Sequence, residues 1–371
     1  MFVCGGTAGH INPALAAAAA LRKRAPGAEI MFVGSGRELE KRLIPQAGYE
    51  LVNIRMTGIV RGLSLKSISG NLRTAVNLVS ASRNARKLIK GFKPDAVLGT
   101  GGHICYPVLG SAGRMGVPTL IHESNAVPGL TTRKLSKSAS NVLTAFPESE
   151  GLYGRPERVI FTGTPVRDGF LSPHGSRAGR KSGEKPLLIS FWGSLGAERM
   201  NEAMAGFFNS NLRDGRFRHI HATGKGGVEK LKKSLLELGA HPELPPGLEI
   251  REYIEEMPAL MAEADLVLCR AGASTIAELT ALGKPAVLIP SPNVVDDHQT
   301  PNALRLQKRG GAVVLDESEC TGDVLYNSVL GIITDEARLA GMSEAQRALG
   351  APDAAERIAG IIIDIAGGNA K

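Results

Sequence analysis

Residues 266–283 read LVLCRAGASTIAELTALG and give the clearest indication of the fold. The apolar run 266–269 suits a buried strand, and a glycine-containing loop leads from it into a helical pattern that opens at Thr275. Gly283 can end that helix, and a second apolar run follows at 286–289. A strand, a loop, a helix and a further strand in this order indicate a βαβ unit of a parallel sheet.

The same alternation of short apolar runs and helical patterns extends over the whole chain. In the first half we expect strands at residues 2–4, 30–33, 96–98, 119–121, 141–145 and 159–161. In the second half we expect strands at residues 187–191, 218–222, 249–252, 266–269, 286–289 and 312–315. The sequence therefore predicts an α/β protein with two Rossmann-like, doubly wound domains that face a central cleft.

The two domains are expected to meet at a hinge near Pro165. The first domain would comprise residues 1–165 together with a C-terminal helix within 352–371, which packs back on it. The second domain would comprise residues 166–351. Pro352 favours a break before that last helix, because the residue before a proline is biased away from helix.

The composition limits the classes of partner. The 371 residues are 43% hydrophobic and 22% charged, as in a globular protein with two packed domains. A formal net charge of +8 indicates an anionic partner. Aromatic residues make up only 4% and no run alternates them with basic residues, so we expect no nucleic-acid binding.

Cysteines and histidines give no sign of a metal site. The four cysteines lie far apart in the sequence: Cys4, Cys105, Cys269 and Cys320. We expect neither disulfides nor zinc from them, and His219 and His221 share a strand face without a third ligand nearby. We also expect no signal peptide and no apolar run of the roughly 20 residues that a membrane span needs. A reducing compartment follows as the expectation.

Loops rich in glycine or polar residues follow several strands: residues 5–10, 99–103, 122–125, 192–197 and 270–275. In open parallel sheets, ligands bind beyond the carboxyl ends of the strands. Glycine lets backbone N–H groups approach an oxyanion, and a following helix N-terminus adds its positive dipole end. Each loop alone is equally compatible with a tight turn. Together they predict a site for a diphosphate.

Spacing argues against other phosphate-binding and hydrolytic sites. The loop 5–10 lacks the G-x-G-x-x-G order of dinucleotide sites, and no G-x-x-x-x-G-K-[ST] occurs. Trp192 stands where a nucleophile elbow requires glycine. No D-x-D is present to hold a divalent ion, so we expect no metal and no cofactor. Helix dipoles and cationic side chains would have to stabilise the leaving group.

Two polar positions remain open to more than one interpretation. Glu278 can accept two hydrogen bonds from a ribose diol, but Thr275 and Glu278 also match a T-x-x-E capping box that would occupy the carboxylate locally. Residues 296–299, Asp-Asp-His-Gln, can bind sugar hydroxyls or form a solvated loop.

The chain resembles the MurG family of glycosyltransferases, family 28 with the GT-B fold. Seven ordered motifs over nearly the whole length carry the resemblance: GGTAGHINPAL, KPDAVLGTGGH, HESNAVPGLTTRKL, TGTPVR, WGSLGA, CRAGASTIAEL and DDHQTPNA. The resemblance implies inverting, metal-independent transfer of GlcNAc from UDP-GlcNAc to the 4-hydroxyl of MurNAc-pentapeptide in lipid I. The product would be lipid II for peptidoglycan synthesis, with the donor in the C-terminal domain and the lipid acceptor against the N-terminal one.

The resemblance also implies a set of substrate-binding residues. Uridine would be surrounded by Ile254, Ala273, Ser274, Thr275, Ile276, Ala277 and Glu278, with Glu278 on the ribose. The diphosphate and the sugar would be lined by Thr7, Ala8, Gly9 and Ser194. Further donor contacts would come from Asn125, Arg167 and Gln299, with Gln299 at the GlcNAc hydroxyls. Members of the family often have glycine at the position of Ala8 and glutamine at the position of His298.

Inversion needs a base that removes the proton of the acceptor hydroxyl. His10 is the first candidate, because a neutral imidazole suits the task and the residue follows a loop that faces the cleft. Alternatively, His10 caps the helix or binds the acceptor phosphate. Glu123 is the second candidate.

A segment of the first domain is a candidate for membrane contact. Its apolar residues are Leu72, Val76 and Val79, and its basic residues are Lys66, Arg73, Arg83, Arg86 and Lys87. Such a helix can lay an apolar face into an anionic inner leaflet, which predicts a peripheral protein on the cytoplasmic face of the cell membrane. An ordinary amphipathic core helix has the same pattern. Among alternative functions we keep a UDP-sugar 2-epimerase and another lipid-acceptor glycosyltransferase.

Overall fold

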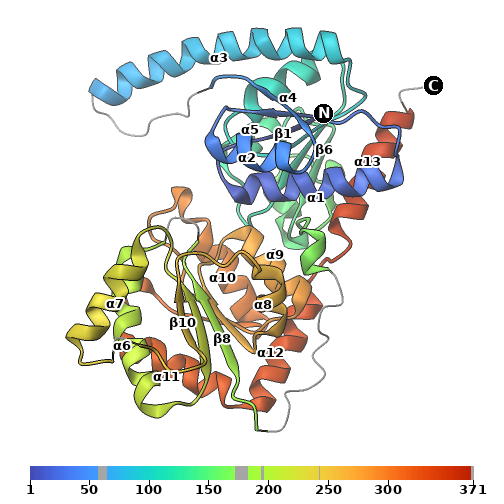
Figure 1. Cartoon of the computed structure of the whole chain (residues 1–371). Coiled ribbons are helices and arrows are strands. Elements are labelled where there is room, and N and C mark those ends of the chain that lie inside the picture. Colours follow the sequence, from blue (N-terminus) through green and yellow to red (C-terminus); the bar gives the residue numbers. More distant parts are fainter. Residues whose placement is uncertain (57–64, 172–182, 194–195, 242, 369–371) are drawn as a thin grey trace. The chain divides into compact units, whose positions relative to one another are not determined.

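A computed structural model describes residues 1–56, 65–171, 183–193, 196–241 and 243–368; for residues 65–76 and Val295 it describes the backbone alone. The chain forms two compact units (Figure 1). Unit 1 comprises residues 1–167 and 351–371, and unit 2 comprises residues 168–350. The sequence had suggested divisions after Pro165 and after Ala351.

Unit 1 is built on a parallel sheet with the strand order β3-β2-β1-β4-β5-β6-β7. The strands are β1 (Phe2–Cys4), β2 (Met31–Gly34), β3 (Glu50–Asn53), β4 (Val97–Gly101), β5 (Thr119–Glu123), β6 (Asn141–Thr144) and β7 (Val159–Phe161). The helices are α1 (Ala8–Arg24), α2 (Glu38–Gln46), α3 (Leu65–Phe92), α4 (Cys105–Arg114), α5 (Leu130–Leu135), α13 (Ala354–Gly368) and the short 3₁₀ turns η1 (Pro147–Leu152) and η2 (Pro156–Arg158).

Two apolar cores cover the faces of this sheet. On one face, α1 packs against α13, and the contact is made of small and branched side chains such as Ala14, Ala17, Ile358 and Ala359. On the other face, α3 and α4 pack through residues that include Ala85 and Val108. Alanines let α1 and α13 approach closely, so the C-terminal helix completes the core of the unit that contains the N-terminus.

Unit 2 repeats the architecture with the strand order β10-β9-β8-β11-β12-β13. The strands are β8 (Leu187–Phe191), β9 (Arg218–Ala222), β10 (Leu248–Arg251), β11 (Leu266–Cys269), β12 (Ala286–Leu288) and β13 (Ala312–Val314). The helices are α6 (Glu198–Asp214), α7 (Gly227–Glu237), α8 (Met257–Glu263), α9 (Ala273–Leu282), α10 (Gln299–Lys308), α11 (Gly322–Ile333), α12 (Glu336–Leu349) and the 3₁₀ turns η3 (Asp168–Phe170), η4 (Val295–Asp297) and η5 (Glu317–Glu319).

The strand orders fix where ligands can bind. In unit 1 the order reverses between β1 and β4, and in unit 2 it reverses between β8 and β11. A doubly wound sheet opens a crevice at this point, beyond the carboxyl ends of the two strands. The predicted α/β class with two Rossmann-like units is confirmed, and the glycine loops 5–10 and 270–275 follow strands at these two reversals.

His219 and His221 are part of the core of unit 2. Ser190 Oγ lies 2.7 Å from His219 Nε2 and 2.7 Å from His221 Nδ1, and all three residues are buried. Burial lowers the pKa of His221 to about 3 and that of His219 well below its ordinary value. Both imidazoles are therefore neutral. Within the described residues, no group of three or more His, Cys, Asp or Glu could hold a metal ion.

Candidate active site

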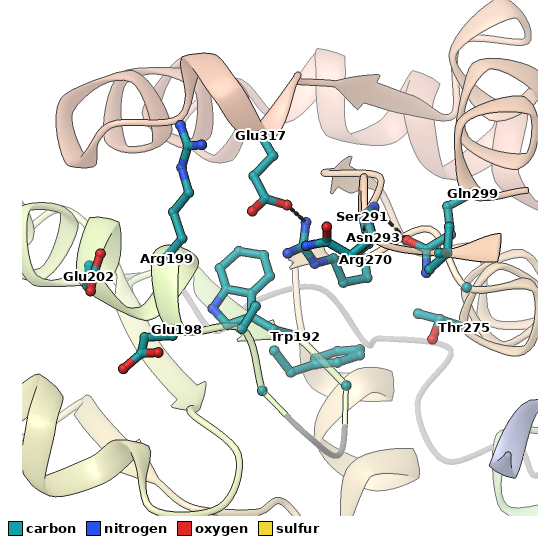
Figure 2. Close-up of a pocket in the computed structure, with 16 residues that line it drawn as sticks. Trp192, Glu198, Arg199, Glu202, Arg270, Thr275, Ser291, Asn293, Gln299 and Glu317 are labelled. Carbon is teal, nitrogen blue, oxygen red and sulfur yellow. Dashed lines mark hydrogen bonds and ion pairs between the residues drawn. The ribbon is translucent and has the colours of Figure 1, made fainter. Parts of the chain in front are cut away.

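A cavity of about 740 Å³ lies at the carboxyl ends of the strands of unit 2. Figure 2 shows Glu198, Arg199 and Glu202 toward one end, and Thr275 and Gln299 toward the other. Its described lining is completed by Phe191, Trp192, Gly193, Gly196, Ala197, Arg270, Gly272, Ser291, Asn293, Val294 and Glu317. Glycine loop, helix start and polar side chains thus meet in one space, as a phosphorylated ligand requires.

The first turn of α9 borders this cavity. The helix begins at Ala273, and its N-cap residue is Gly272. Because glycine has no side chain, the N-cap residue makes no side-chain hydrogen bond to the amides of the first turn. Both Gly272 and Thr275 line the cavity. The predicted helix start at Thr275 is wrong by two residues. Thr275 is the third helical residue, so the T-x-x-E capping box with half-buried Glu278 does not form.

Gln299 has its side-chain amide fixed at the cavity. Its Oε1 accepts a hydrogen bond from the backbone N–H of Ser291 at 2.9 Å (Figure 2). With the oxygen used in this way, the amide nitrogen is the donor that Gln299 presents to a ligand. The preceding Asp296 and Asp297 have positive φ angles of 59° and 44°. Non-glycine residues adopt this conformation infrequently. Residues that do adopt it are often found at functional sites.

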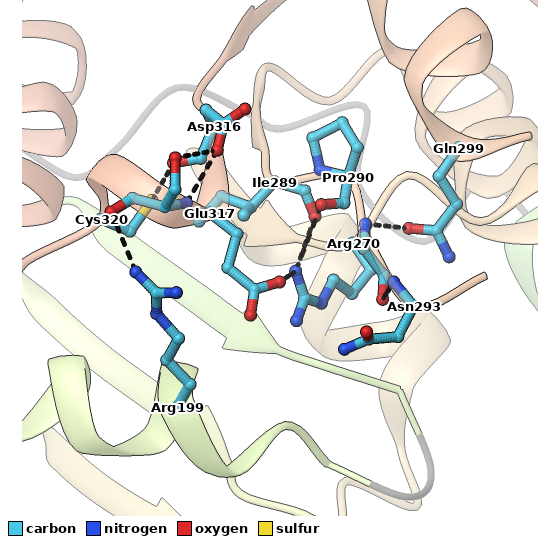
Figure 3. Close-up of polar contacts among 11 residues, drawn as sticks. Arg199, Arg270, Ile289, Pro290, Asn293, Gln299, Asp316, Glu317 and Cys320 are labelled. Atoms are coloured by element: carbon cyan, nitrogen blue, oxygen red, sulfur yellow. Dashed lines mark hydrogen bonds and ion pairs between the residues drawn. The ribbon is translucent and has the colours of Figure 1, made fainter. Parts of the chain in front are cut away.

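The lining of the cavity also includes an ion pair between Arg270 and Glu317. Arg270 Nη1 lies 2.6 Å from Glu317 Oε2, and both residues are largely buried. The same nitrogen donates to the carbonyl of Ile289 at 3.2 Å (Figure 3). The guanidinium carbon lies 5.8 Å from the centre of the Trp192 ring. Sequence reasoning did not single out this pair, because Glu317 lies far from Arg270 along the chain.

In unit 1 the glycine loops after β1 and β4 pack on each other. A Cβ at Gly102 would lie 2.4 Å from the carbonyl oxygen of Gly5, and one at Gly101 would lie 2.4 Å from Cδ2 of His10. Both glycines have positive φ angles, 124° at Gly101 and 87° at Gly102. Only glycine fits both requirements, so these residues bring the His10 imidazole against the backbone of the second loop.

His10 is the third residue of α1 and does not cap it, because the N-cap is Thr7. Its Nδ1 lies 2.8 Å from the carbonyl oxygen of Gly5. A carbonyl can only accept, so Nδ1 carries the proton of the neutral ring and Nε2 carries the lone pair. This tautomer is the one that a general base acting through Nε2 needs.

Glu40 organises the same loops, and sequence reasoning missed it. Its fully buried carboxylate accepts hydrogen bonds from Gly6 N at 2.9 Å, Ser35 Oγ at 2.7 Å, Gly36 N at 2.8 Å and Arg37 N at 3.2 Å. Burial raises the pKa of Glu40, but these hydrogen bonds outweigh it and hold the pKa below its ordinary value. Glu40 therefore ties the loop after β1 to the loop after β2.

Family models match both units of the chain. The model of the glycosyltransferase family 28 N-terminal domain matches residues 1–144, and that of the family's C-terminal domain matches residues 188–358. The chain belongs to glycosyltransferase family 28. The resemblance drawn from the seven motifs is thereby confirmed, and so is the assignment to the glycosyltransferase class of enzymes.

Relatives in family 28 are similar over nearly their whole length. A protein of Acetivibrio thermocellus named UDP-N-acetylglucosamine–N-acetylmuramyl-(pentapeptide) pyrophosphoryl-undecaprenol N-acetylglucosamine transferase is 42% identical over 97% of this chain and 96% of its own. The crystal structure of Acinetobacter baumannii MurG has a TM-score of 0.75 at 28% identity, covering 98% of each chain. A UDP-GlcNAc 2-epimerase of Neisseria meningitidis has a TM-score of 0.65 at 16% identity, covering 98% and 99%, and shares the fold.

Several residues expected in the family-28 site have defined positions in their own units. Thr7 precedes α1, and Ala8 and Gly9 are its first residues. Arg167 is exposed as the last residue of the first segment of unit 1. In unit 2, Ile254 is buried after β10, and residues 273–278 all lie in α9. Ser194 lies outside the described residues.

Glu123 and Asn125 form one local arrangement at the end of β5. Glu123 Oε1 accepts from Asn125 N at 3.1 Å and from Asn125 Nδ2 at 2.9 Å, and Glu123 Oε2 accepts from Gly129 N at 3.1 Å. The buried carboxylate thus shapes the loop that follows β5. These contacts show that Glu123 holds the loop after β5, and its role as the second candidate base stays a prediction.

Proposed function

We propose that the chain transfers GlcNAc from UDP-GlcNAc to the 4-hydroxyl of MurNAc-pentapeptide in lipid I, with inversion and without a metal ion, and so forms lipid II for peptidoglycan synthesis. The observation that carries this proposal is the unit-2 cavity, where the start of α9 and the oriented amide of Gln299 line one space. The 42% identity to a transferase of this specificity over 97% of the chain supports it.

The donor would lie in unit 2. The amides at the start of α9 suit the diphosphate, because that end of a helix attracts anions. Glu278, one turn further along α9, would accept hydrogen bonds from the ribose diol, and buried Ile254 would contact the uracil. Gln299 would donate to the hydroxyl groups of GlcNAc. Ser194, Asn125 and Arg167 complete the proposed donor contacts.

The acceptor would lie against unit 1, with His10 as the base. Nε2 of His10 would take the proton of the 4-hydroxyl as that oxygen attacks the anomeric carbon, and the C–O bond to UDP would break in line. Thr7, Ala8 and Gly9 would face the reacting sugars. The charge that develops on the leaving diphosphate would be stabilised by the α9 amides.

Incubation with radiolabelled UDP-GlcNAc, with and without a lipid-linked MurNAc-pentapeptide acceptor, tests the proposal. We expect UDP release and labelled lipid only when the acceptor is present. Sugar isomerisation that does not need the acceptor would instead identify a 2-epimerase. Transfer to a lipid acceptor that lacks the muramoyl peptide would identify a different glycosyltransferase specificity.

The role of Glu278 predicts a change in ribose selectivity. The wild-type chain should bind UDP more tightly than 2′-deoxy-UDP by roughly tenfold, as expected for a hydrogen bond to a charged group. Glu278→Ala should remove this preference, because both nucleotides then lose the same acceptor. Titration calorimetry with both ligands measures it. Glu263→Ala, an exposed carboxylate at the end of α8, is the control and should retain the preference; retention by Glu278→Ala would contradict the assignment.

We further propose peripheral binding to the anionic cytoplasmic leaflet through α3. In its described half, Ala81, Ala85 and Ile89 are buried, whereas Val79 is 54% exposed and the cations Arg83, Arg86 and Lys87 point outward. Leu72, Val76, Lys66 and Arg73 belong to the half for which the backbone alone is described. Among the helices of the described residues, none is long and apolar enough to cross a bilayer.

Charge reversal on α3 should weaken vesicle binding. In a vesicle sedimentation assay, the triple variant Arg83→Glu, Arg86→Glu, Lys87→Glu should bind anionic vesicles with roughly 10²-fold lower affinity. Each surface cation contributes about 1 kcal/mol to such binding. Reversal of the exposed Lys230, Lys232 and Lys233 in α7 of unit 2 is the matched control and should have little effect. Equal loss in both variants would indicate a general charge effect and contradict the α3 surface.

A further inference from the structure

Two of the described residues that line the unit-2 cavity are cationic, Arg199 and Arg270, and they are held differently. Arg199 is exposed and donates to the carbonyl of Ser318 at 2.9 Å. Arg270 is only 9% exposed and lies beside the Trp192 ring. A buried cation is costly unless a carboxylate or a ligand anion pairs with it. The buried guanidinium of Arg270 therefore needs an anionic partner from the protein or from a ligand.

Glu317 provides that partner from a different part of the chain. Its carboxylate is 2.6 Å from Arg270 Nη1, and its residue is 8% exposed. Glu317 opens η5, whose N-cap Asp316 accepts from Ser318 N at 2.7 Å and so holds the turn in place (Figure 3). The carbonyls of Ile289 and Pro290 also accept from Nη1, at 3.2 and 3.4 Å. The protein thus fixes one nitrogen, Nη1, of the five-donor guanidinium.

We propose that Arg270 binds the diphosphate of the donor and that Glu317 is its positioning residue and counter-ion. Arg270 precedes the N-cap Gly272 by two residues and lines the same cavity as Gly272 and Thr275, so guanidinium and α9 amides converge on one anion. Without nucleotide, Glu317 balances the buried cation. With nucleotide bound, its negative charge opposes the diphosphate and limits how tightly the UDP product is held.

The assignment rests on the proposed function, because it presumes a nucleoside-diphosphate donor. It adds to that function a diphosphate-binding cation and a residue that promotes product release. Uridine shares the nucleoside of UDP and lacks the phosphates. The ratio of the two dissociation constants therefore reports contacts to the diphosphate alone, and general damage to the cavity would not change it.

Glu317→Gln tests the counter-ion. Glutamine keeps the length and shape of the Glu317 side chain but removes its negative charge. We expect UDP to bind about fivefold or more tightly, from the loss of charge repulsion at this range, and to dissociate more slowly. Uridine affinity should stay within about twofold of the wild-type value, since the repulsion acts on charge. Unchanged or weaker UDP binding, measured by calorimetry and stopped-flow dissociation, would overturn the role of Glu317.

The double variant Arg270→Gln, Glu317→Gln tests the cation without leaving a buried carboxylate unpaired. UDP should bind roughly tenfold or more weakly than to the wild type, with uridine unaffected. Equal UDP affinity overturns the assignment. A parallel loss of uridine binding also overturns it, because Arg270 would then support the nucleoside side of the cavity. Neither assay uses GlcNAc or an acceptor: wild-type protein that fails to bind UDP refutes the proposed donor, whereas wild-type binding with unchanged variants refutes this assignment alone.

Discussion

Replacing His10 with alanine should lower kcat by roughly 10²-fold or more, the usual contribution of a general base. Nδ1 of the imidazole is held by the Gly5 carbonyl, so its lone pair is on Nε2, where a hydroxyl proton can be taken. The affinity for UDP, measured by calorimetry, should be unchanged, because His10 is not among the proposed donor contacts and the proposed contacts to the nucleotide, α9 and Ile254, belong to unit 2. Steady-state kinetics at saturating donor and acceptor measures the effect.

His10→Gln separates the base from a purely structural role. A glutamine amide can still donate to the Gly5 carbonyl, yet it has no basic nitrogen. We expect kcat to stay as low as in His10→Ala. Recovery of kcat in the glutamine variant would show that His10 only holds the loop, and an unchanged kcat in His10→Ala would refute its role as base. In either of these cases Glu123 becomes the next candidate to substitute.

Loss of the Glu40 carboxylate should lower the free energy of unfolding of unit 1 by about 3 kcal/mol or more, since it would leave several buried donors without an acceptor. Glu40→Ala and the matched control Glu38→Ala can be compared by chemical denaturation. Glu38 lies on the same helix with its side chain 89% exposed, so its removal should cost less than about 0.5 kcal/mol. Similar effects in both variants would refute the loop-tying role of Glu40.

The same carboxylate gives unit 1 a defined acid sensitivity. The folded-state pKa of Glu40 is lowered, so its stabilising effect is fully present above the unfolded-state pKa, near 4.3 for glutamate. It is lost as the pH falls through the lower, folded-state pKa. Between about pH 5 and pH 3, stability should therefore fall more steeply in the wild type than in Glu40→Gln, which cannot titrate at this position.

Most strands could be located from the sequence because each is an apolar run that ends in glycine or a polar residue. β8, β9 and β11 begin and end where expected. β3 (Glu50–Asn53) was missed: it lies at the edge of its sheet, its residues are exposed or half-buried, and its pattern therefore lacks the signal of a buried strand. The start of α9 was placed two residues late, because Gly272 acts as N-cap without the side-chain cap that sequence reasoning looks for.

The candidate site was predictable only where its residues follow strands. Gly101, Gly102 and His10 come together because β1 and β4 are neighbours in the sheet. Glu40 is the third residue of α2 and three of its partners are within five residues of it, but the contact with Gly6 of the loop after β1 appears only in the folded chain. Arg270 and Glu317 are paired by the approach of η5 to the end of β11, which only the folded chain reveals.

Unit 2 is an insertion within unit 1, and this determines the order in which the chain can fold during synthesis. Residues 168–350 are continuous and carry their own core, so this part can close as soon as it has left the ribosome. The alanine face of α1 is made before unit 2, whereas its cover, α13, is made after it. Until residues 354–368 emerge, the nascent N-terminal part exposes the apolar face of α1, and such exposed apolar surface is prone to aggregation during synthesis.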